Sequence, residues 1–281
     1  MINYHIHENG WTVILDDVDF NTLTQEDVNH IARLVATNTC VIAKKQNLTL
    51  ENELRILKMF KNPKPLFQPT DLKFKHCSVD PEGIICRVTA ERNEHGHTGI
   101  GANPGDFDWH NNLPWDPNRS PIIWLYGVRG TVDSRTSWNN NILAYNDLDN
   151  DTKEQLKKLK LIVLSPEMSD GHQPASWVND KHEFDFVYTN NAGQTGLYFP
   201  VYDIDHFVGM SREESLKLIQ PLIDHVLQEK YLYHHDWDDG DISISDQWLG
   251  VHKRWKFVSL ETRVLHRAAV DYPDQNYQGI E

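Results

Sequence analysis

The stretch 237–267, WDDGDISISDQWLGVHKRWKFVSLETRVLHR, decides the fold. Residues 242–245 (ISIS) alternate apolar and polar side chains with a period of two, which predicts a half-buried strand. His252 falls on the next expected strand, and Arg263 and Arg267 follow it by 11 and 15 residues on the strand after that. This segment therefore combines a candidate metal ligand with two candidate groups for binding anions.

Upstream of this stretch, the sequence predicts a mainly β architecture with flanking helices. An amphipathic helix is expected at 24–37, where Thr24 and Asp27 form a capping box, and another begins at Ser211, which pairs with Glu214 in the same way. Pro221 is expected to kink the second of these helices. Further helices are predicted at 50–60 and 151–160, strands at 40–43, 84–89, 122–128 and 161–164, and a mobile loop at 91–106.

Composition limits the classes of protein that fit. A chain of 281 residues with 39% hydrophobic content suits one compact domain, 1–281. Its formal net charge of −14 disfavours binding to nucleic acid or to an anionic membrane. A small-molecule substrate fits better, and an anionic one requires basic residues concentrated inside a pocket. A homo-oligomer is also compatible with this composition.

The cysteine pattern and the N-terminus indicate a cytoplasmic protein. Cys40, Cys77 and Cys86 form no CxxC pair, so we expect three buried or half-buried thiols and no disulfide framework. The first ten residues, MINYHIHENG, do not have the basic and then apolar pattern of a signal peptide. No apolar run approaches the length that crosses a bilayer.

A second candidate site segment, Trp109-His110-Asn111-Asn112, lies far upstream of His252. A facial metal triad with open positions can be built from two ligands close together on one strand and a distant histidine on a neighbouring strand. The chain has 15 histidines, so other pairs remain alternatives, namely His95 with His97, His234 with His235, and His266. Taken alone, Arg263 and Arg267 are more often residues of solvent-facing salt bridges.

Several motifs in order resemble the taurine dioxygenase (TauD/TfdA) family over roughly 24–270. Phe107-Asp108-Trp109-His110 is similar to the segment that leads to the family's first iron ligand, and Thr136 lies 26 residues after His110 at a threonine that contacts 2-oxoglutarate. The remaining matches are the helix start at 209–215, the segment 237–246 before the distal histidine, and the spacing of the two arginines after it.

The resemblance implies a double-stranded β-helix (a jelly roll, cupin-like) and an Fe(II)- and 2-oxoglutarate-dependent dioxygenase that uses O2 to hydroxylate a small, anionic organic substrate and releases succinate and CO2. It also implies the roles of the site residues. Metal ligands and catalytic residues would be His110, Asn112 and His252; Thr136 and Arg263 would bind 2-oxoglutarate, and Arg267 the substrate.

Asn112 departs from the family pattern, which has a carboxylate at this position. Three alternatives follow: Asn112 is a neutral third ligand, or it leaves a position for chloride as in related halogenases, or the protein is a non-catalytic binder of 2-oxoglutarate. A nearby carboxylate, Asp108 or Asp116, could compensate. Asp108 is the better candidate of the two, because it lies two residues before His110 and alternate residues of a strand share a face.

Overall fold

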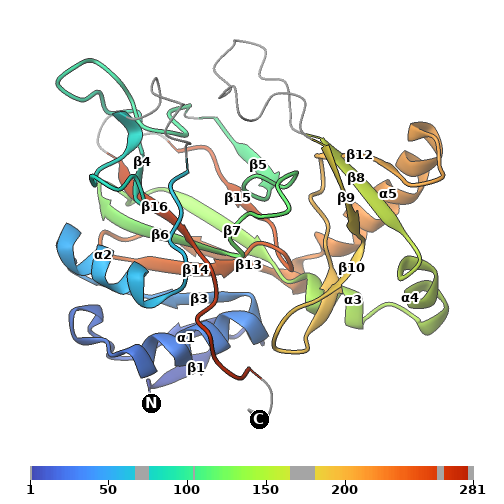
Figure 1. The fold of residues 1–281 in the computed structure, drawn as a ribbon, viewed down its shortest axis with the longest axis horizontal. Coiled ribbons are helices and arrows are strands. Elements are labelled where there is room, and N and C mark those ends of the chain that lie inside the picture. Colours follow the sequence, from blue (N-terminus) through green and yellow to red (C-terminus); the bar gives the residue numbers. More distant parts are fainter. Residues whose placement is uncertain (1, 67–75, 104, 165–180, 258–262, 278–281) are drawn as a thin grey trace.

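The computed structural model describes residues 2–66, 76–103, 105–164, 181–257 and 263–277, and it confirms a mainly β fold with flanking helices (Figure 1). The largest sheet has seven strands, which are antiparallel except for one parallel pair, β2 and β3. Its order is β1 (Tyr4–Ile6), β2 (Val13–Leu15), β3 (Cys40–Ala43), β14 (Ile242–Asp246), β6 (Ile122–Arg129), β16 (Val264–Val270) and β4 (Cys86–Val88).

A second sheet of four antiparallel strands carries most of the candidate site. Its order is β13 (Leu232–Asp236), β7 (Arg135–Asn139), β15 (His252–Arg254) and β5 (Phe107–His110). Side chains of both sheets pack in one apolar cluster, in which Trp138 and Tyr233 of the smaller sheet meet Ile42 and Leu265 of the larger one. The two sheets therefore face each other, and the site lies in the layer between them.

Helices cover the other face of the seven-stranded sheet. Helices α1 (Gln25–Asn38) and α2 (Leu50–Met59) pack with alternate residues of β14, β6 and β16 in a second apolar cluster. Ala268 and Val270 point toward these helices, whereas Leu265 points toward the four-stranded sheet. Because side chains alternate along a strand, Arg267 lies on the same inner side as Leu265.

The long insertion between β7 and β13 forms a separate group of elements at one side of the molecule (Figure 1). Its own apolar cluster is rich in aromatic residues. This group consists of the sheet β12 (Ile204–Phe207), β8 (Lys160–Leu164) and β9 (Lys181–Asp185), the hairpin β10 (Val187–Thr189) and β11 (Thr195–Leu197), and helices α3 (Asn141–Asn146), α4 (Asn150–Leu156) and α5 (Arg212–Val226).

Both predicted capping boxes are confirmed, at Thr24 and Asp27 and at Ser211 and Glu214. On α2 the apolar Leu50 is exposed, whereas the charged Glu53 is buried. Glu53 accepts a hydrogen bond from Trp124 Nε1 at 2.9 Å and contacts His266 Nδ1 at 2.6 Å. A charged residue is buried here because partners on β6 and β16 satisfy both carboxylate oxygens.

The three cysteines are buried free thiols, as predicted. Among the described residues, no helix has the length and apolar character needed to cross a membrane.

Candidate active site

His110 and His252 lie opposite each other on the paired strands β5 and β15. Their ring centroids are 4.1 Å apart, with an interplanar angle of 49°. The structure therefore brings together two predicted ligands that are separated by more than half of the sequence. Pairing of the two strands fixes this proximity, so it does not depend on a flexible loop.

Both imidazoles are held in the neutral form that binds metals. Burial, assisted by the positive charge of Arg267, lowers the pKa of His110 to about 4 and that of His252 well below its ordinary value. His110 Nδ1 lies 2.6 Å from the backbone carbonyl of Asp108, which can only accept a hydrogen bond. The proton of the neutral ring is therefore on Nδ1, and Nε2 keeps a lone pair for a metal ion.

A β-bulge in β5 determines which side chains accompany His110. His252 pairs with His110 and Arg254 pairs with Phe107, so β5 has one extra residue over this interval. Because of the bulge, Asp108 lies on the opposite side of the strand from His110, and its carboxylate contacts Lys253 Nζ at 3.1 Å. The prediction that Asp108 shares the face of His110 is wrong, since a bulge shifts the alternation of side chains by one residue.

Asn111 joins the two ligand-bearing segments, a role that the sequence reasoning missed. Its buried amide donates to the backbone carbonyls of Gln247 at 2.6 Å and Gly250 at 2.8 Å. In return, Gln247 Oε1 accepts a hydrogen bond from the backbone N–H of Asn112 at 2.9 Å. We call these four residues, Asn111, Asn112, Gln247 and Gly250, the asparagine clasp. It fixes the chain after His110 against the turn that precedes His252.

Asn112 follows the end of β5 and does not continue the strand. Its Nδ2 atom is buried and has no hydrogen-bond partner in the described part of the chain. Within that part, no group of three or more His, Cys, Asp or Glu side chains could hold a metal ion. The two imidazoles thus offer a divalent cation two nitrogen donors, and no carboxylate among the described residues completes the set.

Arg263 and Arg267 are both buried, at 3% and 4% exposure, so the alternative of solvent-facing salt bridges is wrong. Among the described residues neither has a carboxylate partner, and the Nε atom of each is buried without an acceptor. Burial and the nearby Arg254 lower the pKa of Arg263 to about 9, which still leaves it charged at neutral pH. Two buried arginines without a described carboxylate partner, one of which, Arg267, is close enough to lower the pKa of both histidines, favour the binding of an anion.

Thr136 is buried on β7, and its hydroxyl oxygen accepts a hydrogen bond from Trp237 Nε1 at 2.9 Å. In the described part of the chain this hydroxyl donates to no acceptor, so its proton can be donated to a ligand. In the pairing of β15 with β7, Thr136 lies opposite Arg254. Arg254 is a second residue that sequence reasoning missed, and its position two residues after His252 was the available signal.

The alternative histidines have other partners. His235 lies 3.0 Å from Asp241, and His266 lies 2.6 Å from Glu53. His234 contacts Ser137 and Glu229, and His95 and His97 are exposed. His97 also stacks on His76, with ring centroids 4.4 Å apart, but these two histidines do not lie on paired strands as His110 and His252 do.

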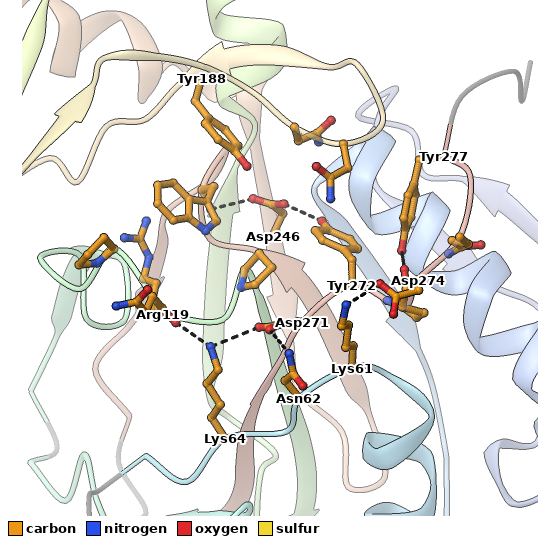
Figure 2. A pocket seen from close by; sticks show the side chains of 18 of the residues that line it. Lys61, Asn62, Lys64, Arg119, Tyr188, Asp246, Asp271, Tyr272, Asp274 and Tyr277 are labelled. Atoms are coloured by element: carbon orange, nitrogen blue, oxygen red, sulfur yellow. Dashed lines mark hydrogen bonds and ion pairs between the residues drawn. The ribbon is translucent and has the colours of Figure 1, made fainter.

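A polar pocket of about 1010 Å³ lies behind the turn that leads to His252 (Figure 2). Asp246 accepts hydrogen bonds from the backbone N–H groups of Trp248 and Leu249 and from the hydroxyl of Tyr272 at 2.6 Å. The guanidinium of Arg119 stacks on Trp248, 3.9 Å from the ring centroid. These contacts hold the turn in place. Most of the charged groups that line the pocket pair with one another, as Lys61 does with Asp274.

The two facing sheets define a double-stranded β-helix, with the histidine pair and the buried arginines in its interior. The family model described as "Taurine catabolism dioxygenase TauD, TfdA family" matches residues 7–269. The chain belongs to this family.

Solved structures agree with this fold. A taurine dioxygenase from Burkholderia xenovorans superposes with a TM-score of 0.76 at 19% identity, covering 96% of this chain and 89% of that one. AAD-2 in complex with Mn(II) and N-oxalylglycine superposes with a TM-score of 0.80 at 17% identity, covering 98% and 99%.

Curated relatives match over shorter regions. Pentalenolactone F synthase of Streptomyces arenae is 25% identical over 59% of this chain and 62% of its own length. The alpha-ketoglutarate-dependent 2,4-dichlorophenoxyacetate dioxygenase of Burkholderia sp. (strain RASC) is 25% identical over 44% of each chain. The chain therefore spans less than two thirds of the length of either relative.

Proposed function

We propose that this protein is an Fe(II)- and 2-oxoglutarate-dependent dioxygenase that hydroxylates a small, anionic organic substrate. The observation that carries this proposal is the pair of facing, neutral imidazoles together with two buried arginines that have no carboxylate partner among the described residues. Three comparisons support the same assignment. The family is named for dioxygenases, and one relative is named as alpha-ketoglutarate-dependent. One structural neighbour holds Mn(II) with N-oxalylglycine.

The metal would be held by Nε2 of His110, by His252 and by the side-chain oxygen of Asn112. Iron(II) with 2-oxoglutarate supplies an oxidant from O2 that inserts oxygen into a C–H bond, with release of succinate and CO2. The chain's own contribution is to keep both imidazoles neutral and aligned before the ion arrives. Burial keeps both imidazoles neutral, while the hydrogen bond from His110 to the Asp108 carbonyl and the asparagine clasp keep them aligned.

Arg263 and Thr136 would hold the distal carboxylate of 2-oxoglutarate. A guanidinium offers two parallel N–H donors that match a carboxylate, and the free hydroxyl proton of Thr136 adds a third. Arg267 would bind the anionic group of the substrate, because its inner position on β16 places its charge near both histidines. All three groups are buried, so an anion that reaches them is shielded from water.

A second candidate is a variant in which chloride completes the metal site. Asn112 brings no charge, and its buried Nδ2 atom has no acceptor among the described residues, which favours a small anion nearby. Product analysis with and without chloride separates this candidate from hydroxylation. A non-catalytic binder of 2-oxoglutarate would form no succinate with any substrate.

The direct test is calorimetric titration of the Mn(II)-loaded protein with N-oxalylglycine, followed by an assay of succinate formation with iron(II) and 2-oxoglutarate. We expect saturable 1:1 binding that requires the metal, and succinate formation that depends on O2. Failure of N-oxalylglycine to bind would overturn the proposal, and binding without any succinate would leave only the non-catalytic role.

A further inference from the structure

Trp237 lies directly behind one of the groups that would bind the co-substrate. It follows the last residue of β13, and its indole Nε1 donates a hydrogen bond to the hydroxyl oxygen of Thr136 at 2.9 Å. Its backbone N–H donates to the carbonyl of Ser134, two residues before Thr136, at 3.0 Å. Both the main chain and the side chain of Trp237 are therefore attached to the segment that carries Thr136.

The indole ring is enclosed, since Trp237 is 2% exposed. The His235 ring meets it at a nearly perpendicular angle of 81°, with centroids 4.9 Å apart, and the Trp138 ring lies 6.5 Å away. On the larger sheet, Gly127 of β6 leaves room for the ring, because a Cβ atom at this position would lie 3.2 Å from the indole Cε3. His235 is itself held by the buried Asp241 at 3.0 Å. These contacts fix the direction of the indole N–H.

A fixed indole N–H decides what the Thr136 hydroxyl can offer a ligand. A hydroxyl has one proton to donate and two lone pairs, whereas an indole N–H can only donate. Thr136 therefore accepts from Trp237, and its own proton is the group that it offers to a ligand.

Arg254 links Thr136 to Arg263. It lies opposite Thr136 in the pairing of β15 with β7. The guanidinium groups of Arg254 and Arg263 both lie over the ring of Phe257, at 5.2 and 4.7 Å from its centroid. A guanidinium has five N–H donors and no acceptor. The end of the site that contains Arg263 and Thr136 thus presents donors to a ligand.

We infer that Trp237 is a positioning residue that presents the Thr136 hydroxyl as a hydrogen-bond donor, and so favours a co-substrate that ends in a carboxylate over one that ends in a carboxamide. The inference rests on the proposed function and deepens it by stating how this end of the co-substrate is recognised. A carboxylate only accepts hydrogen bonds, so it can satisfy the guanidinium and the hydroxyl together. A carboxamide brings two N–H donors of its own, and burial against other donors leaves them unpaired.

The test is a double-mutant cycle on the affinity for N-oxalylglycine, measured by calorimetric titration of the Mn(II)-loaded protein. Trp237→Phe keeps an aromatic ring and removes the N–H, and Thr136→Val removes the hydroxyl at nearly constant volume. We expect each change to weaken binding about fivefold to tenfold, and the double variant to bind no more weakly than Thr136→Val. The affinity for Mn(II) alone should stay within about twofold in all three variants.

The corresponding amide, N-oxalylglycinamide, tests the selectivity. The unaltered protein should bind N-oxalylglycine at least about tenfold more tightly than the amide. Trp237→Phe should lower this ratio about threefold or more, because the freed lone pair of Thr136 can then accept from the amide. Equal affinity of the unaltered protein for the two compounds would overturn the inference without the use of any variant.

A matched control is Trp124→Phe on β6. Trp124 is fully buried, and its Nε1 also donates at 2.9 Å, to Glu53 on the helix side of the sheet. This variant should leave the affinities for Mn(II) and N-oxalylglycine unchanged. A loss of N-oxalylglycine affinity equal to that in Trp237→Phe, additive losses in the double variant, or a ratio that Trp237→Phe does not change would each overturn the inference. Failure of the unaltered Mn(II)-loaded protein to bind N-oxalylglycine would instead overturn the proposed function, and the inference with it.

Discussion

Asn111, directly after the strand that carries His110, donates a hydrogen bond from its side-chain amide to the backbone carbonyl of Gln247 in the turn before His252, at 2.6 Å. A second bond from the same nitrogen reaches the carbonyl of Gly250 at 2.8 Å. The pairing of β5 with β15 sets the two histidines opposite each other, and the asparagine clasp holds the chain segments beyond that pairing. The geometry of the histidine pair thus depends on a residue that would never touch the metal.

The first prediction concerns this clasp. Asn111→Ala should raise the dissociation constant for Mn(II) by roughly 10- to 100-fold, because residues that orient metal ligands contribute on that scale. Loss of a buried amide should also lower the free energy of unfolding by about 1–3 kcal/mol. Asn190→Ala is a matched control, since Asn190 is also buried and donates to a backbone carbonyl, that of Ala36, at 2.7 Å. Equal loss of metal affinity in the two variants would show that Asn111 acts on stability alone.

The second prediction concerns the missing carboxylate. Asn112→Asp should tighten binding of Fe(II) or Mn(II) by about tenfold or more, because it supplies a negative charge at a site that has none among the described residues. In a hydroxylase the change should preserve or raise turnover, and in a chloride-using variant it should abolish chlorination. Calorimetric titration of the metal and product analysis measure these effects. Weaker metal binding by Asn112→Asp would mean that another group is the third ligand.

The third prediction concerns the anchor for the co-substrate. Arg263→Ala should weaken binding of N-oxalylglycine to the Mn(II)-loaded protein by about 2–4 kcal/mol, because a desolvated carboxylate loses its charged partner. Arg135→Ala is the control, since that arginine is 46% exposed in its side chain and pairs with Asp236. Unchanged affinity in Arg263→Ala would exclude this residue from the co-substrate site.

The fourth prediction concerns Asp203, in the turn before β12. Burial raises the pKa of its carboxyl from 3.8 to about 6. The folded protein then holds this proton more tightly than the unfolded chain, so the free energy of unfolding falls as the pH rises from about 4 to above 6. Asp203→Asn should therefore stabilise the protein by about 2–3 kcal/mol at pH 7.5 and by little at pH 4. Urea denaturation at both pH values measures the change in the free energy of unfolding, and Asp151→Asn on α4 is a surface control. Equal stabilisation by Asp203→Asn at the two pH values would contradict a raised pKa for Asp203.

The regular elements of the fold could be predicted from the sequence because their signals are local. The capping boxes at Thr24 and Ser211 mark helix starts within one turn, and the alternation in 242–245 predicts β14 to within one residue. The family resemblance then supplied the pairing of distant strands that local patterns cannot provide. It is through this pairing that His110 and His252, which the sequence predicted as ligands, are brought together.

What could not be predicted depends on contacts between distant segments. The bulge places Asp108 on the opposite side of β5 from His110 and Phe107 on the same side as His110. It exists only in the register of β5 against β15. Glu53 on α2 is buried only because Trp124 and His266 meet its carboxylate from other strands. The role of Asn111 depends on backbone carbonyls, and backbone carbonyls carry no signature in a sequence.

The measurement that tests the account most directly is the Mn(II) affinity of three proteins: the unaltered chain, His252→Gln and His266→Gln. His252 faces His110, whereas His266 lies on β16 and contacts Glu53, a contact that glutamine can partly replace. We predict that His252→Gln abolishes measurable binding of Mn(II) and of N-oxalylglycine, while His266→Gln, checked for folding by circular dichroism, retains both within about threefold. Metal binding that survives in His252→Gln, or is lost equally in both variants, would contradict the metal site on which the proposed function depends.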